Sequence, residues 1–286
     1  MVNFKLFTNE MLVFPNCKIN LGLHVVNKRT DGFHNIETVF YPVSWCDGLE
    51  VLENKESQEG FIFTESGIPI AGDPSQNLIY KAWEIIKTEK KLPALKVHLH
   101  KNIPMGAGLG GGSSDAAYFI NLLNDQCDLN YTEEEKTGIA SQLGSDCAFF
   151  IKNTPLFAKG KGNEFSEIKV DLSEYFIFLV YPNVHSNTKE AYDGLIPKHP
   201  DNDLGTILAS PLKEWKEKLV NDFEGSIFKK YPEVKVLKES MYAAGALYAS
   251  MSGSGSAVFG IFEKEPIIHF PEHFSTYLQK PLKKIL

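Results

Sequence analysis

The stretch Pro104–Ala117, "PMGAGLGGGSSDAA", carries five glycines within residues 106–112, followed by two serines and an aspartate. A glycine inside a regular element costs roughly 0.5–1 kcal/mol relative to alanine, so such density suggests a special backbone requirement. The preceding "ALKVHLH" (94–100) alternates as a strand does, and "SSDAAYFINLLN" (113–124) has helical apolar spacing. A strand, a glycine-rich loop and a helix N-terminus together favour phosphate binding, because inward N–H groups and the helix dipole attract anions.

Other interpretations of this loop stay open at this point. It can be a surface turn in which Ser114 acts as an ordinary N-cap of the following helix. Gly106, Gly108 and Gly111 also satisfy the dinucleotide pattern G-x-G-x-x-G, which would fit a dehydrogenase, but no clean βαβ unit surrounds them. A Walker A loop is excluded because no Gly-Lys-Ser/Thr follows.

Composition narrows the classes of protein. The chain has 286 residues, 43% hydrophobic residues and a net charge of −7, which indicates a folded protein and argues against nucleic-acid or membrane partners. Its four cysteines are scattered without zinc spacing, so we expect reduced thiols: Cys17, Cys46, Cys127 and Cys147. The first residues lack the pattern of a signal peptide, and we expect a cytoplasmic protein.

Strands and helices alternate irregularly along the rest of the chain, which favours an α+β fold over a doubly wound sheet. The other predicted strands cover residues 17–26, 34–43, 47–54, 175–182 and 256–262. The other predicted helices cover residues 77–91, 132–144 (with a Thr132–Glu135 capping box), 211–220, 222–230 and 232–244. A polar, Lys/Gly-rich stretch near 152–172 is the predicted domain junction.

Two further stretches hold charged residues next to apolar runs. "FPNCKINLGLHV" (14–25) places Lys18 and Asn20 on one face of a strand that otherwise reads as buried. "LGSDCAFF" (143–150) places Asp146 after a helix-ending glycine. Taken singly, Lys18 fits a snorkelling lysine, Asp146 a turn residue, and the small-residue loop 250–259 a simple turn.

Taken together and in this order, these stretches resemble the GHMP kinase superfamily, from about Phe14 to about Phe262. With "RTDGFH" (29–34), they resemble the branch that phosphorylates cytidine-diphosphate methylerythritol in non-mevalonate isoprenoid synthesis. The chain departs from that branch in having Cys17 and Ser145 for alanine, Ala107 for glycine and Phe33 for tyrosine. Ala107 therefore requires a negative φ.

The resemblance implies a GHMP kinase fold with a ribosomal-protein-S5-like N-terminal domain (1–155) and a ferredoxin-like C-terminal domain (156–286), with the active site between them. It implies transfer of the ATP γ-phosphoryl to the 2-hydroxyl of that substrate, with Mg²⁺ accompanying ATP. The implied catalytic residues are Lys18 and Asp146. The implied ATP-binding residues are Asn77, Pro104, Met105, Gly106, Ala107, Gly108, Leu109, Gly110, Gly111, Gly112, Ser113 and Ser114. The implied substrate-binding residues are Asn20, Phe33, His34, Thr188 and Tyr192.

Several points stay open in the sequence. Asn77 fits a helix N-cap at least as well as an adenine contact. No metal ligand is assigned; His98 and His100 share a strand face, but without a third ligand they favour packed or solvated histidines. The chain can be a monomer or a homodimer. Another small-molecule GHMP kinase, or a non-catalytic nucleotide-binding regulator on the same fold, is the alternative function.

Overall fold

The computed structural model describes residues 11–57 and 60–282 and has an α+β fold. The chain divides into two compact units. Of the described residues, the first unit contains 11–17, 45–57, 60–105 and 110–154. The second unit contains Lys18–Ser44, Gly106–Leu109 and residues 155–282. Both ends of the glycine-rich loop therefore belong to the first unit, whereas its residues Gly106–Leu109 belong to the second.

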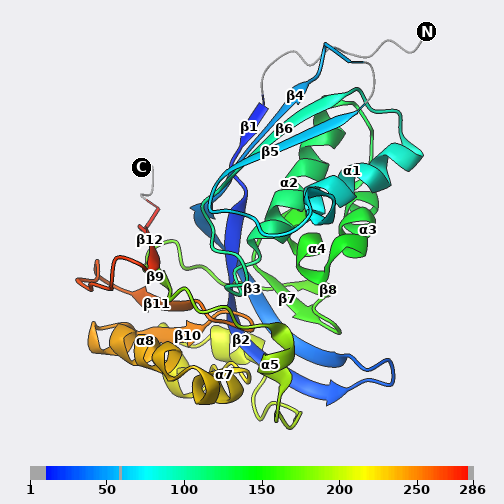
Figure 1. Cartoon of the computed structure of the whole chain (residues 1–286). Helices are drawn as coiled ribbons and strands as arrows, with labels where there is room; N and C mark the ends of the chain where they lie inside the picture. Colours follow the sequence, from blue (N-terminus) through cyan, green and yellow to red (C-terminus); the bar gives the residue numbers. More distant parts are fainter. Residues whose placement is uncertain (1–10, 58–59, 283–286) are drawn as a thin grey trace. The chain divides into compact units, whose positions relative to one another are not determined.

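The first unit is a four-stranded sheet with helices on one face (Figure 1). The strand order is β1-β4-β6-β5, antiparallel except for the parallel pair β5 and β6. Its strands are β1 (Met11–Val13), β4 (Gly48–Glu53), β5 (Phe61–Gly67) and β6 (Leu95–Lys101). Its helices are η1 (Pro74–Gln76), α1 (Leu78–Glu89), α2 (Gly111–Gln126), α3 (Glu133–Leu143) and α4 (Ser145–Lys152). Alternate residues of β6 are buried against the helices, and Phe61 of β5 stacks on Trp83 of α1 at 4.8 Å between ring centroids.

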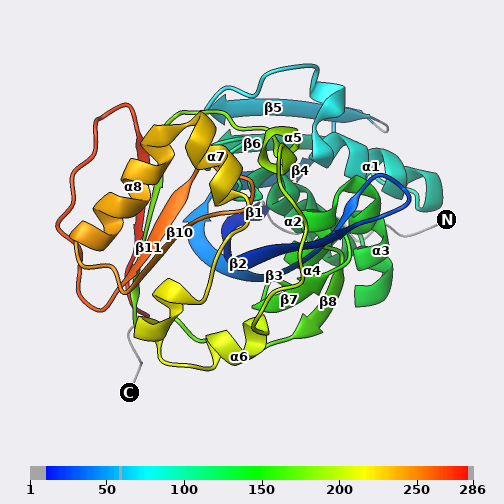
Figure 2. The same ribbon diagram turned by 90° about the horizontal axis from the view of Figure 1, so that it is seen from below.

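The second unit holds two four-stranded sheets, ordered β2-β3-β7-β8 and β10-β11-β9-β12. The strands of the first are β2 (Asn16–Lys28), β3 (His34–Cys46), β7 (Leu156–Lys159) and β8 (Glu164–Glu167). Those of the second are β9 (Phe176–Tyr181), β10 (Tyr248–Met251), β11 (Val258–Phe262) and β12 (Ser275–Gln279). The helices are α5 (Thr188–Tyr192), α6 (Leu204–Leu208), η2 (Leu212–Glu217), α7 (Glu224–Lys230) and α8 (Pro232–Ala243). Figure 2 shows α7 and α8 beside β10 and β11, where Leu237, Met241 and Phe262 belong to one buried apolar cluster.

The predicted elements are largely confirmed, and the differences have local causes. α3 carries the predicted Thr132–Glu135 capping box and ends at Gly144. The helix predicted at 211–220 is present but shorter: it is the 3₁₀ helix η2, which begins after Pro211 and ends at Glu217. The sequence also did not indicate α4, because its single apolar run at 147–151 has no resolvable period.

The chain leaves the first unit for the last time after Thr154. The predicted domain boundary at 155/156 lies one residue further along. Residues 18–44 group with the second unit although they lie early in the sequence, because β3 pairs with β7. The division into domains 1–155 and 156–286 stays a prediction. In the described part of the chain, no helix combines the length and the hydropathy that crossing a membrane would require.

Candidate active site

The glycine-rich loop has an alternating backbone. Gly106, Gly108 and Gly110 have φ of 64°, 77° and 71°, in the left-handed region that favours glycine. Ala107, between the first two, is not among the described non-glycine residues of positive φ, so the expectation of a negative φ is confirmed. Alternating conformations of this kind turn successive N–H groups toward one side, which is the geometry of a backbone anion site.

Helix α2 begins at the end of this loop, four residues earlier than a Ser114 N-cap would require. Its N-cap is Gly110, which offers no side-chain hydrogen bond, and its first turn holds no acidic residue. The interpretation of Ser114 as the N-cap is therefore wrong. Ser114 is completely buried inside the helix, and its Oγ has no hydrogen-bond partner in the structure. The free N–H groups of this helix end are suited to an anion.

The N-terminal end of α4 lies beside that of α2 within the first unit. The Ser113 hydroxyl of α2 hydrogen-bonds the Cys147 thiol of α4. Burial raises the pKa of that thiol to about 11, the hydrogen bond with Ser113 opposes this, and the charge of Asp146 adds to the increase. Asp146 lies in the first turn of α4 and is partly exposed. A carboxylate and a candidate phosphate-binding helix end thus meet in one place.

Lys18 lies in the second unit, on β2, and is only 3% exposed. Its ammonium donates to Asn20 Oδ1 at 2.7 Å and to the carbonyl of Gly108 at 3.0 Å, and lies 5.0 Å from the Phe40 ring centroid. Asn20 is oriented in turn, because its Nδ2 donates to Thr38 Oγ1 at 2.9 Å. A lysine directed inward toward the glycine loop is not a snorkelling residue. The predicted shared face of Lys18 and Asn20 is confirmed.

The small-residue loop at 250–259 donates hydrogen bonds to the glycine loop. The sequence of residues 250–259 did not indicate this contact. Ser252 Oγ donates to the Gly108 carbonyl at 2.9 Å, and Ala257 N donates to the Ala107 carbonyl at 3.1 Å. A Cβ on Gly108 would lie 2.0 Å from the carbonyl oxygen of Ser252. Gly108 is therefore required both by its φ and by the close approach of this second loop.

The residues implied for cytidine binding are brought together only in part. The rings of His34 and Tyr192 stack on each other, with centroids 4.4 Å apart and planes inclined by 16°. Phe33 is 59% exposed, and its ring lies 4.8 Å from the Lys161 ammonium. Thr188 begins α5, with its hydroxyl 3.4 Å from that of Ser254. A base can use the face of Tyr192 that now contacts His34 only if the histidine ring moves.

Burial lowers the pKa of His34 below its ordinary value of 6.5, and the nearby Lys28 contributes in the same direction. His34 is therefore mostly neutral at pH 7, with one ring nitrogen as donor and the other as acceptor. Such a ring can read one edge of a base.

Asn77 has a clear structural role. Its Oδ1 accepts a hydrogen bond from Ile79 N at 2.9 Å, which caps α1. The N-cap interpretation is confirmed, and a contact with adenine stays a prediction. His98 and His100 bond neighbouring hydroxyls, His98 with Thr64 and Ser66, and His100 with Ser66.

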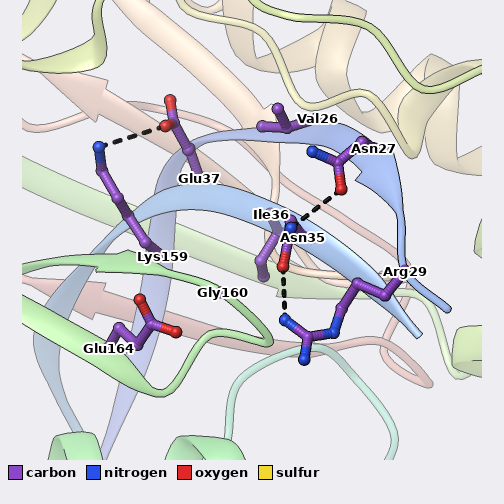
Figure 3. Close-up of a pocket in the computed structure, with 9 residues that line it drawn as sticks. All are labelled: Val26, Asn27, Arg29, Asn35, Ile36, Glu37, Lys159, Gly160 and Glu164. Atoms are coloured by element: carbon purple, nitrogen blue, oxygen red, sulfur yellow. Dashed lines mark hydrogen bonds and ion pairs between the residues drawn. The ribbon is translucent and has the colours of Figure 1, made fainter. Parts of the chain in front are cut away.

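A separate polar pocket of about 290 Å³ lies in the second unit, where β2, β3, β7 and β8 end (Figure 3). Arg29 donates to Asn35 Oδ1 at 2.9 Å, and Asn35 donates to Asn27 Oδ1 at 2.9 Å. Arg29 also bonds both carboxylate oxygens of Asp31 at 3.1 Å. None of the predicted site residues lines this pocket; its polar contacts fix the hairpin turn that carries Phe33.

Comparison with known proteins agrees with this geometry. Residues 77–154 match the family model "GHMP kinases N terminal domain", and residues 206–270 match "GHMP kinases C terminal". The chain is 49% identical to a 4-diphosphocytidyl-2-C-methyl-D-erythritol kinase of Parabacteroides distasonis over 92% of its length and 94% of the relative's. It is 52% identical to the kinase of the same name in Cytophaga hutchinsonii, over 90% and 94%.

Solved structures show the same fold. A crystal structure of a 4-(cytidine 5'-diphospho)-2C-methyl-D-erythritol kinase matches with a TM-score of 0.76 and 30% identity, over 88% of this chain and 90% of that one. A homoserine kinase from Cytophaga hutchinsonii, at 15% identity, matches with a TM-score of 0.68 over 98% of both chains and supports the fold alone. The chain belongs to the GHMP kinases, as an ATP-dependent member. Within that family it belongs with the 4-diphosphocytidyl-2-C-methyl-D-erythritol kinases.

Proposed function

We propose that this protein transfers the γ-phosphoryl group of ATP to the 2-hydroxyl of 4-diphosphocytidyl-2-C-methyl-D-erythritol, in the non-mevalonate route to isoprenoid precursors. The observation that carries the proposal is identity of about half over nine-tenths of the chain to kinases of that name. The glycine loop with an uncapped helix end, the buried lysine and the Asp146 carboxylate supply the groups that phosphoryl transfer requires.

In this mechanism the loop binds and orients the triphosphate. The N–H groups of residues 106–112 and the N-terminus of α2 donate to phosphate oxygens, and the hydroxyls of Ser113 and Ser114 lie in the first turn of that helix. Pro104 and Met105 lead the chain into the loop. Asn77 is proposed to contact the adenine side through the part of its amide that does not cap α1.

Asp146 is the proposed general base that accepts the proton of the attacking hydroxyl. Lys18 is the proposed electrostatic group, whose ammonium stabilises negative charge on the reacting oxygens. Asn20 and the Gly108 carbonyl hold that ammonium in place, so no reorganisation is needed during the reaction. The reaction requires Lys18 and Asp146 to reach the same transferred phosphoryl group.

Mg²⁺ is proposed to bind with ATP. Among the residues that the structure describes, no three His, Cys, Asp or Glu side chains gather as a metal site. Mg²⁺ prefers oxygen ligands and is usually held by substrate phosphates, waters and one or two protein groups. The hydroxyls near the N-terminus of α2 fit that preference. The unpartnered hydroxyl of Ser114 or the neighbouring Ser113 hydroxyl would hold it together with the ATP phosphates, and the ion would neutralise phosphate charge.

The acceptor is proposed to be recognised through its cytosine. Phe33 and Tyr192 offer aromatic faces for stacking, His34 offers one donor and one acceptor to the base edge, and Thr188 offers a hydroxyl. Asn20, which donates a hydrogen bond to Thr38, is proposed to bind the sugar-alcohol portion of the substrate.

The decisive experiment is a coupled ADP-release assay with four acceptors: the cytidine-diphosphate substrate, mevalonate, homoserine and galactose. We expect turnover with the first alone. Turnover with another acceptor would assign a different small-molecule GHMP kinase, and ATP binding without any turnover would assign a nucleotide-binding regulator. A cytoplasmic location and a monomeric or homodimeric state remain predictions, the latter measurable by light scattering.

A further inference from the structure

A buried charge cluster lies under the N-terminus of α2 and takes no part in the mechanism above. Lys101, Asp47 and Asp115 are each only 2% exposed. The Lys101 ammonium donates to Asp47 Oδ2 and, at 2.9 Å, to Asp115 Oδ2. One ammonium between two carboxylates is an expensive arrangement to bury, since well-packed apolar residues often stabilise a fold as well.

The cluster joins the two ends of the glycine loop. At the entry, Asp47 Oδ1 accepts hydrogen bonds from the backbone N–H groups of Asn102 and Ile103, at 2.6 and 2.8 Å. At the exit, Asp115 belongs to α2, four residues after its first residue. Lys101 bonds both carboxylates. The segments before and after residues 104–110 are therefore both held to the ammonium of Lys101, through Asp47 at the entry and Asp115 at the exit.

The ammonium also lies against the helix end itself. A Cβ on Gly111, the first residue of α2, would come within 3.3 Å of Lys101 Nζ. A cation is unfavourable at a helix N-terminus, because the helix dipole is positive there. The two carboxylates are needed to hold it, and the absence of a side chain on Gly111 lets it approach.

The protonation of the cluster follows from the same packing. Burial raises the pKa of Asp115 above its ordinary value; the ammonium of Lys101 opposes the shift, and the Asp47 charge adds to it. Burial alone would lower the pKa of Lys101, but the two carboxylates outweigh it and the pKa is raised. The cluster therefore keeps its ammonium near neutral pH.

We propose that Lys101, Asp47 and Asp115 are positioning residues of the phosphate loop, which fix its entry and its exit so that its N–H groups are set for ATP before ATP binds. The proposal rests on the proposed function only in taking ATP as the ligand. It predicts that loosening the cluster weakens nucleotide binding and leaves binding of the phosphoryl acceptor unchanged, because preorganisation lowers the ordering cost of the loop alone.

The test compares two substitutions of one residue. Asp115→Asn keeps an oxygen that accepts from Lys101, and Asp115→Ala removes it. Titration calorimetry with Mg²⁺ and the non-hydrolysable analogue AMP-PNP should show affinity within about threefold of wild type for the first variant and a loss of about tenfold or more for the second. The Kd of the cytidine substrate should stay within about twofold in both.

Tyr118→Phe is the matched control, three residues further along α2. It removes a partly buried hydroxyl that donates to Asn16 Oδ1 at 2.8 Å and accepts from Asn153 Nδ2 at 3.0 Å. We expect it to lower Tm and to leave AMP-PNP binding unchanged. If Asp115→Ala does not fold, the double variant Lys101→Met/Asp115→Ala replaces it, because it removes the pair together and leaves no unpaired ammonium at the helix end.

Wild-type affinity for AMP-PNP in Asp115→Ala, or in the double variant where that is used, would overturn the proposal. So would an equal loss for AMP-PNP and the cytidine substrate, or a loss no greater than that of Tyr118→Phe at a matched fall in Tm. Failure of the proposed function has a different signature: wild-type protein would then bind AMP-PNP but not the cytidine substrate, and the AMP-PNP comparison would still decide the role of the cluster.

Discussion

Gly108→Ala should disable the enzyme, because this glycine has a positive φ, lies against the Ser252 carbonyl and bonds Lys18 through its own carbonyl. Its φ of 77° costs an L-residue about 1–2 kcal/mol. Its new Cβ would lie 2.0 Å from the Ser252 carbonyl oxygen, which is backbone, so one of the two loops has to move. The Gly108 carbonyl accepts from the Lys18 ammonium at 3.0 Å and from Ser252 Oγ at 2.9 Å, and a displaced loop loses both bonds.

The size of the effect follows from these contacts. A hydrogen bond to a charged group contributes about 1.5–3 kcal/mol, and a neutral one about 0.5–1.5 kcal/mol. With the backbone strain, the total is roughly 3–6 kcal/mol. Because the displaced carbonyl holds the ammonium that the mechanism uses, we expect the loss mainly in kcat/KM, by about 10²–10⁴-fold.

The assay is coupled ADP release with the folded fraction of the variant, with Tm measured in parallel. Gly245→Ala is the matched control: its φ of 93° is also positive, but a Cβ there would meet nothing within 4 Å. It should lower stability by about 1–2 kcal/mol and leave kcat/KM unchanged. The reasoning fails if Gly108→Ala keeps kcat/KM within threefold of wild type, or if Gly245→Ala loses as much.

Three further substitutions test the other proposed roles. Asp146→Asn should lower kcat by ~10²–10⁴-fold with little change in ATP binding, and a folded variant that retains most turnover would reduce Asp146 to a helix-end residue. Lys18→Met keeps much of the apolar stem and should lower kcat by ~10²–10³-fold; a collapse of Tm with normal activity in the folded fraction would indicate a structural lysine instead. His34→Ala should raise KM for the cytidine substrate about tenfold and leave KM for ATP unchanged, and NMR titration of wild type should give a His34 pKa below 6.5.

The sequence by itself determined the local elements and the chemistry of the chain. Alternating and helical apolar patterns predicted β2, β3, β6 and α1, and a capping box predicted the start of α3, because these features depend on neighbours a few residues apart. The motifs around Lys18, Phe33, the glycine loop and Asp146, taken in their order along the chain, were enough to show the resemblance to the family. Their geometry was not available from that order.

Tertiary structure decided which of these residues meet and what holds them. That Ser252 and Lys18 share the carbonyl of Gly108 depends on residues 144 and 90 positions away, and no local pattern encodes such a contact. The same holds for Lys101, which joins Asp47 to Asp115 and so fixes both ends of the loop. The alternative in which Ser114 caps α2 is wrong because Gly110, free to adopt a positive φ, lets the helix begin earlier than side-chain capping preferences predict. Local preferences set the elements, whereas burial and long-range hydrogen bonding fixed the site, because those depend on chain segments that only folding brings together.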